Sequence, residues 1–169
     1  MHATLYPAAT TYNGTSSSET IDHHLDTTAH VYLGNGGDDI LVGGSGDDIL
    51  VGGVGHDTLT GGAGHDTFVI DPSALSGISA QDLIMDYTNG GVNGDTIDLT
   101  NLFTKDASIA INQYVHETAT GLLEVSVNGT GTNWVTVAHV TTDGVAAAAP
   151  TTVNILYHDD ANTNHTVVV

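Results

Sequence analysis

Large apolar residues recur every nine positions through the middle of the chain, at Leu41, Leu50, Leu59 and Phe68. Each is the centre of three residues that follow a glycine cluster and an aspartate, in four consecutive copies: GNGGDDILV, GGSGDDILV, GGVGHDTLT and GGAGHDTFV. One inward side chain between two outward ones is typical of a short β-strand, and glycine clusters are typical of tight turns. Residues 34–70 therefore predict four turn-and-strand units.

The flanking segments have different patterns. Residues 1–33 are rich in Thr, Ser and His, and we expect an irregular first turn or cap there. Residues 71–169 contain the apolar runs GLLEVSV, WVTVAHV, TVNILYH and HTVVV. These predict antiparallel strands, with NGTGTN as a hairpin loop, and DPSAL predicts a single helical turn capped by Asp71. The chain is thus expected to be all-β, in segments 1–33, 34–70 and 71–169.

The spacing of the aspartates suggests a chemistry for the repeats. One turn plus one strand makes half a coil, so Asp39 lies one coil from Asp57, and Asp48 one coil from Asp66. Stacked strands are about 4.8 Å apart, and two carboxylates at that distance repel by roughly 3 to 4 kcal/mol at an effective dielectric constant near 20. A cation must offset this repulsion. Carboxylate and carbonyl oxygens favour calcium over zinc or copper.

Composition supports a cationic partner. Lys105 is the one basic residue against 20 acidic ones, and the formal net charge is -19. Such a chain is repelled by nucleic acid and by anionic membranes, so neither is expected as a partner. It has no cysteine, no apolar run of membrane-spanning length and no basic-then-apolar signal peptide in MHATLYPAATTYNG. We expect a monomer that does not insert into membranes.

The nonapeptides resemble those of the RTX (repeats-in-toxin) proteins, whose consensus is G-G-x-G-x-D-x-U-x, where U is a large apolar residue. The resemblance implies a right-handed parallel β-roll with calcium bound between the turns of repeats n and n+2. It assigns side-chain ligands to Asp39, Asp48, Asp57 and Asp66, and carbonyl ligands to the turn glycines Gly34, Gly36, Gly43, Gly52 and Gly61. The chain departs from the consensus at Asn35, which replaces a glycine, and has His56 and His65 at the variable fifth position.

The acidic segment after the repeats extends the resemblance. DLIMDYTNGGVNGDTIDLTNLF, residues 82–103, is similar to the segment that follows RTX rolls in proteins exported by type I secretion. The resemblance implies one more calcium site that closes the roll, with ligands at Asp82, Asp86, Asp95 and Asp98. The alternative is that these four are ordinary turn carboxylates.

The remainder of the chain is similar to the C-terminal β-rich domains of large type I-secreted bacterial adhesins. Its ending, ILYHDDANTNHTVVV, resembles the uncleaved signals that type I transporters recognise, although HTVVV could instead be an edge strand. We therefore expect a secreted, extracellular or cell-surface protein that is not an enzyme. Its roll would stay unfolded in the low-calcium cytosol and fold outside the cell.

Two alternatives remain open. The chain could be a polysaccharide-binding module similar to the R-modules that accompany alginate-modifying enzymes, in which case calcium would have to bridge the protein to a polyanion. It could also be the C-terminal part of a secreted hydrolase.

Overall fold

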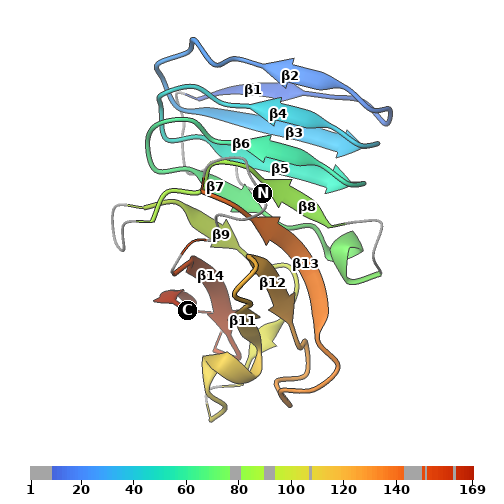
Figure 1. The fold of residues 1–169 in the computed structure, drawn as a ribbon, viewed down its shortest axis with the longest axis vertical. Helices are drawn as coiled ribbons and strands as arrows, with labels where there is room; N and C mark the ends of the chain where they lie inside the picture. The colour runs from blue at the N-terminus through green and yellow to red at the C-terminus, as the bar shows by residue number, and fades with distance from the viewer. Residues whose placement is uncertain are drawn as a thin grey trace.

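The computed structural model describes residues 9–76, 81–89, 94–106, 108–142, 150, 152–161 and 163–169. Within these ranges the strands form two sheets that face each other through most of the molecule (Figure 1). The first sheet contains β1 (Thr10–Asn13), β3 (His30–Gly36), β5 (Ile49–Val54), β7 (Thr67–Val69), β9 (Thr96–Asp98), β14 (Asn154–Asp159) and β10 (Thr104–Lys105), with β15 (Asn164–Val168) paired to β14. The second contains β11 (Val115–Glu117), β12 (Leu122–Val125), β13 (Val135–Val140), β8 (Asp82–Ile84), β6 (Thr58–Thr60), β4 (Ile40–Val42) and β2 (Thr20–Asp22).

The repeats wind as a parallel β-roll, which confirms the predicted fold class. Consecutive strands alternate between the two sheets, so each strand pairs with the strand two places later in the chain. In the first sheet Tyr32 is in register with Leu50, and Leu50 with Phe68. In the second sheet Leu41 is in register with Leu59. Two nonapeptides therefore complete one coil, as the spacing predicted.

The core of the roll is a double row of the apolar residues that mark the nine-residue period. Leu41, Leu50, Leu59 and Phe68 are all fully buried between the sheets. Burying one such side chain contributes about 1.5 to 3 kcal/mol. The same rows continue beyond the repeats. Ile84 is in register with Leu59, Ile97 is in register with Phe68, and both are fully buried.

An additional coil precedes the four repeats. β1 pairs in parallel with β3, and β2 pairs in parallel with β4. Tyr12 is in register with the buried Tyr32, and the two rings stack with their centroids 5.4 Å apart. The segment expected as an irregular first turn or cap therefore contains strands that extend both sheets of the roll.

The C-terminal strands continue the same two sheets. β12 pairs antiparallel with both β11 and β13, and β14 pairs antiparallel with β15, in agreement with the alternating pattern. The expected hairpin loop joins β12 to β13. However, β13 pairs in parallel with β8 and β14 pairs in parallel with β9. These strands therefore close the end of the roll and share its core, where Val137 and Ile155 are fully buried.

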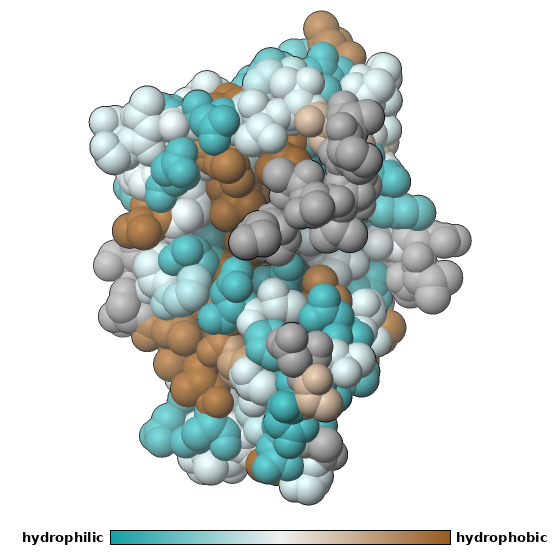
Figure 2. All heavy atoms as spheres, turned by 180° about the vertical axis from the view of Figure 1, so that it is seen from behind, coloured by the Kyte–Doolittle hydropathy of each residue, from teal (hydrophilic) through white to brown (hydrophobic). Residues whose placement is uncertain are grey.

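Short 3-10 turns occur at η1 (Pro72–Ser76) and η4 (Ile111–Gln113). At η1 the Ser73 backbone N–H donates to Asp71 Oδ1 at 2.8 Å, so Asp71 caps the turn as predicted. No helix among the described residues is long and apolar enough to cross a membrane. Figure 2 shows the opposite face, where apolar atoms lie in separate patches between hydrophilic ones.

Candidate metal centre

The repeat aspartates form a ladder along each edge of the roll. Each carboxylate accepts a hydrogen bond, through Oδ1, from the backbone N–H of the residue one coil earlier. On one edge Asp39 N–H donates to Asp57 Oδ1 at 2.8 Å. On the other edge Asp48 N–H donates to Asp66 Oδ1 at 2.9 Å. The backbone of one coil thus fixes the side chain of the next, and the carboxylates are buried because the turns stack over them.

In three of these carboxylates the second oxygen has no hydrogen-bond partner among the described residues. Asp39, Asp57 and Asp66 are each at most 1 % exposed. Their Oδ2 atoms are buried and have no hydrogen-bond partner among the described residues. Leaving a buried polar atom unsatisfied costs about 1 to 3 kcal/mol, and more when the group is charged. The turns therefore present buried, unpaired acceptors that a cation would satisfy.

Backbone carbonyls converge on the same oxygens. A methyl group added at Gly34 would clash with both Asp39 Oδ2 and Gly52 O. On the opposite edge, a methyl group added at Gly43 would clash with Gly61 O and with Asp48 Oδ2. Gly34 and Gly43 are each the first residue of a nonapeptide. Each lines a small cradle that consists of a carboxylate oxygen of its own turn and a carbonyl oxygen of the next coil. We call these the Gly34 and Gly43 cradles.

Burial makes the ionised carboxylates costly without a cation. It raises the pKa of the Asp66 and Asp82 carboxyls to about 8 and that of Asp95 to about 6. The pKa is also raised by burial in Asp39, Asp48 and Asp57. Nearby like charges add to the effect, since Asp95 and Asp48 both raise the pKa of Asp66. Oxygen ligands of this kind suit a hard divalent cation.

The comparison with known families agrees with this chemistry. Residues 33–68 match the model of the RTX calcium-binding nonapeptide repeat, in four copies. These four units are RTX repeats. They bind calcium, and proteins that carry RTX repeats are typically secreted. Calcium is therefore a cation that fits the buried carboxylates and the glycine cradles.

The fold has a counterpart among solved structures. The solution structure of the AlgE6R3 subunit from the Azotobacter vinelandii mannuronan C5-epimerase matches with a TM-score of 0.56 and 24% sequence identity. The match covers 84% of this chain and 80% of that one, so the likeness in fold extends well beyond the RTX repeats. No curated protein sequence matches the chain.

Two of the acidic residues after the RTX repeats extend the ladders. Asp82 Oδ1 accepts from Asp57 N–H at 3.1 Å, which places Asp82 below Asp57 on the first edge. Asp95 Oδ1 accepts from Asp66 N–H at 2.9 Å, which places Asp95 below Asp66 on the second edge. Both are buried. They occupy the same structural position as the repeat aspartates, although the nine-residue period has ended.

The other two acidic residues are held differently. Asp86 accepts from the backbone N–H groups of Gly61 and Gly62, at 2.9 and 2.8 Å, so its carboxylate lies against a repeat turn. Asp98 accepts from the N–H and the hydroxyl of Thr100, at 2.8 and 2.6 Å, in a local turn. The structure therefore places Asp82 and Asp95 in the ladders, Asp86 beside them and Asp98 outside them.

The glycines assigned to the sites also separate into two groups. Gly52 and Gly61 lie against the carboxylates of Asp57 and Asp66, as Gly34 and Gly43 lie against theirs. Gly36 differs, because an added methyl group would make only an ordinary contact of 3.7 Å with Val54 O. Gly36 therefore lines no cradle.

The fifth-position histidines donate backbone N–H groups to aspartates one coil earlier. His56 N–H donates to Asp38 Oδ1 at 3.0 Å, and His65 N–H donates to Asp47 Oδ1 at 2.9 Å, both at exposed positions. In the part of the chain that the structure describes, no three His, Cys, Asp or Glu side chains form a metal cluster. The cradles instead bring carboxylate and backbone carbonyl oxygens together.

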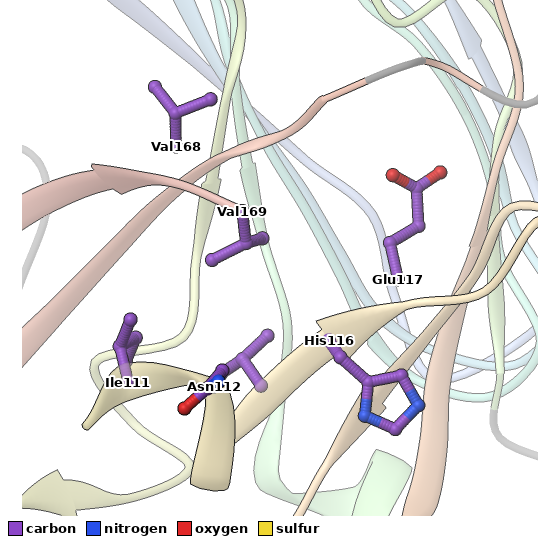
Figure 3. Close-up of a pocket in the computed structure, with 7 residues that line it drawn as sticks. Ile111, Asn112, His116, Glu117, Val168 and Val169 are labelled. Carbon is purple, nitrogen blue, oxygen red and sulfur yellow. The ribbon is translucent and has the colours of Figure 1, made fainter. Parts of the chain in front are cut away.

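A cavity of about 320 Å³ lies away from the ladders, between η4, β11 and the last two residues (Figure 3). Its lining is largely apolar and includes Ile111, Val115 and Val169. Glu117 also lines it, with Oε1 buried and unpartnered among the described residues, and burial raises the Glu117 pKa to about 7. The cavity includes none of the ladder carboxylates, so it is separate from the metal centre.

Proposed function

We propose that this chain is a calcium-dependent folding module of a secreted protein, and that its roll folds only when calcium is bound. The unpartnered Oδ2 atoms of Asp39, Asp57 and Asp66, buried inside the turns, are the observation that carries the proposal. Without a cation these charges oppose folding, and with one they join adjacent coils. The free energy of calcium binding then becomes free energy of folding.

Circular dichroism tests this proposal directly. The chain should show little β signal in chelator and regain it, with a cooperative thermal transition, when millimolar calcium is added. Equal β content and equal thermal stability in chelator and in calcium would reject it.

We further propose that residues 71–169 connect folding to export, as in type I-secreted adhesins. The C-terminal strands extend the sheets of the roll, so folding of the roll and of the C-terminal region share one core. A chain kept unfolded in a low-calcium cytosol can pass through a type I transporter and fold outside. The module itself is proposed to be non-catalytic, with any enzymatic or adhesive activity belonging to a larger protein.

The structure suggests a clean test of the export signal. β15 pairs with β14 along one side and lies at the edge of the sheet, whereas Ile155 of β14 is fully buried. Deleting residues 163–169 therefore removes the last strand and leaves β14 in place. We expect export from a host with the matching transporter to fail while calcium-induced folding remains. Normal export of the shortened chain would place the signal elsewhere.

A second candidate function is calcium-dependent polysaccharide binding. It is favoured by the likeness in fold to the AlgE6R3 subunit, which comes from a mannuronan epimerase. The net charge of -19 opposes direct contact with a polyanion, so calcium would have to act as a bridge. Pull-down on immobilised polyuronate in calcium and in magnesium separates the candidates. Retention in calcium alone would favour the polysaccharide module, and no retention would favour the folding and export module.

A further inference from the structure

The coil that precedes the RTX repeats contains a turn with the geometry of a repeat. GTSSSETID, residues 14–22, aligns without a gap with GNGGDDILV, residues 34–42. The structure supports this alignment, because Thr20 is in register with Ile40 and Ile21 with Leu41. Glu19 N–H donates to Asp39 Oδ1 at 2.8 Å, which is the ladder bond seen between later coils. Glu19 therefore occupies the position of a ladder aspartate, outside the residues that match the repeat family.

A cradle accompanies this carboxylate. A methyl group added at Gly14 would lie 2.6 Å from Glu19 Oε2 and 2.6 Å from Gly34 O. The Gly34 and Gly43 cradles, which lie inside the calcium-binding repeats, consist of the same parts: the first glycine, a carboxylate oxygen of its own turn and a carbonyl oxygen of the next coil. The longer Glu19 side chain thus brings an oxygen to the place that an aspartate oxygen reaches in the repeats.

Hydrogen bonds orient the Glu19 carboxylate but do not use all of its acceptor positions. Oε2 accepts from Thr15 N–H at 2.8 Å and Oε1 accepts from the Thr15 hydroxyl. Inside the repeats Asp48 Oδ2 accepts in the same way from Gly44 N–H, also four residues earlier, at 2.9 Å. A carboxylate has about four acceptor positions. Glu19 therefore keeps lone pairs for a cation, as Asp48 does.

The turn is also open to solvent and adds a second charge. A cavity of about 290 Å³ is lined by Glu19, Asp38 and neighbouring residues of the two coils. Burial raises the pKa of the Asp39 carboxyl, the hydrogen bond from Glu19 N–H lowers it, and the Glu19 charge raises it by a smaller Coulombic effect. A cation bound here would offset this repulsion as it does in the following coils.

The opposite edge of the same coil lacks these features. His30 occupies the equivalent ladder position, with its N–H donating to Asp48 Oδ1 at 2.8 Å. Its imidazole lies near Asp26, with Nε2 3.4 Å from Asp26 Oδ2. Calcium prefers oxygen ligands to imidazole nitrogen. The difference between Glu19 and His30 predicts an added site on one edge only.

We propose that Glu19 and the Gly34 carbonyl bind one additional calcium ion between the first two coils. The inference rests on the proposed function, since it applies the calcium chemistry of the RTX repeats to a turn outside them. It extends the calcium-dependent unit to β1 and β2, so the ion fastens the first coil to the roll.

Native mass spectrometry of the whole chain in calcium counts the ions. We expect Glu19→Gln to bind one ion fewer than the wild type. Glu19→Asp restores the residue found in the repeats and should keep the full number. Asp160→Asn, which removes an exposed charge on the C-terminal region, should also keep it.

Hydrogen exchange supplies a second, local measurement. In calcium, Glu19→Gln should raise amide exchange in β1 and β2 at least tenfold and leave β5 and β7 protected. An unchanged ion count in Glu19→Gln, or unchanged exchange in β1 and β2, would overturn the additional site. Failure of the proposed function would look different, because the wild type would then bind no calcium or fold equally well in chelator.

Discussion

Asp39 and Asp57 occupy successive coils on one edge of the roll, and the backbone N–H of Asp39 donates to Asp57 Oδ1 at 2.8 Å. The remaining oxygen of each carboxylate is buried and unpartnered among the described residues. One oxygen of each aspartate thus holds the coils in register, and the other is left for a cation. Folding of the turns and binding of calcium are therefore coupled through the same side chain.

Asp57→Asn separates these two roles. The amide keeps an oxygen that can accept from Asp39 N–H but removes the charge that calcium requires. We expect the calcium concentration at the midpoint of folding to rise at least tenfold, which corresponds to about 1.4 kcal/mol of binding free energy. A calcium titration followed by circular dichroism measures this.

His56→Ala is the matched control, because the adjacent histidine contributes its backbone N–H to Asp38 and its side chain is exposed. It should shift the midpoint less than twofold. If the alanine variant is as damaging as Asp57→Asn, the fifth position takes part in binding and the ligand register is wrong.

Acid should favour the metal-free fold. Burial raises the pKa of Asp66 and Asp82 from 3.8 to about 8, so the folded state binds more protons than the unfolded chain across this interval. The contribution to stability is fully present below pH 3.8 and is lost as the pH rises through about 8. Metal-free protein should therefore gain β signal as the pH falls from 8 towards 5. This range stays above the isoelectric point of the chain, near 4.2.

Each kcal/mol gained should raise the melting temperature by roughly 2 to 4 °C for a domain of this size. Asp66→Asn, which resembles the protonated residue, should reduce the pH response and stabilise the metal-free fold at pH 8. A metal-free chain that becomes less stable on acidification would show that the ladder carboxylates are not buried as described.

Local patterns in the sequence predicted the repeats well because both of their requirements are local. An inward residue every nine positions defines the core rows. The aspartates from Asp39 to Asp66 recur with the same period. Even the exception follows a local rule: Asn35 replaces a glycine and has a φ of 73°. Asparagine tolerates this left-handed conformation better than most residues.

The sequence did not predict strand pairs whose partners lie far apart along the chain, or a turn that departs from the repeat consensus. The repeat pattern did not predict Glu19 because GTSSSETID has serines in place of glycines and glutamate in place of aspartate, and because Glu19 lies 20 residues before Asp39, where the repeats separate such residues by 18. Alternation in the C-terminal segment predicted antiparallel strands, but not the parallel pairing of β13 with β8 or of β14 with β9, since alternation says nothing about a distant partner. Asp98, which the resemblance assigns to a closing site, accepts hydrogen bonds from Thr100, and its role as a calcium ligand stays a prediction.

Magnesium should replace calcium poorly. The cradles combine carboxylate and carbonyl oxygens from two coils, a set that suits the long bonds and flexible geometry of calcium. Magnesium requires shorter bonds in strict octahedral geometry and keeps several of its waters. We expect the midpoint concentration for folding to be at least a hundredfold higher for magnesium than for calcium. Comparable midpoints would indicate screening of the net charge of -19 in place of specific sites.

Gly34→Ala tests the cradle itself. Gly34 has no positive φ, so alanine would not strain the backbone, and its effect would come from the added methyl group. That methyl would clash with Asp39 Oδ2 and Gly52 O, the oxygens that should face the ion. Forcing these atoms apart should cost about 1 to 3 kcal/mol in the calcium-bound state.

Gly36→Ala, in the same turn, is the control, because its methyl group would make an ordinary 3.7 Å contact with Val54 O. Thermal unfolding in saturating calcium should therefore show a lower melting temperature for Gly34→Ala and little change for Gly36→Ala. Equal effects of the two substitutions would mean that the clash with Asp39 Oδ2 and Gly52 O does not cause the loss, and that the cradle does not hold the ion.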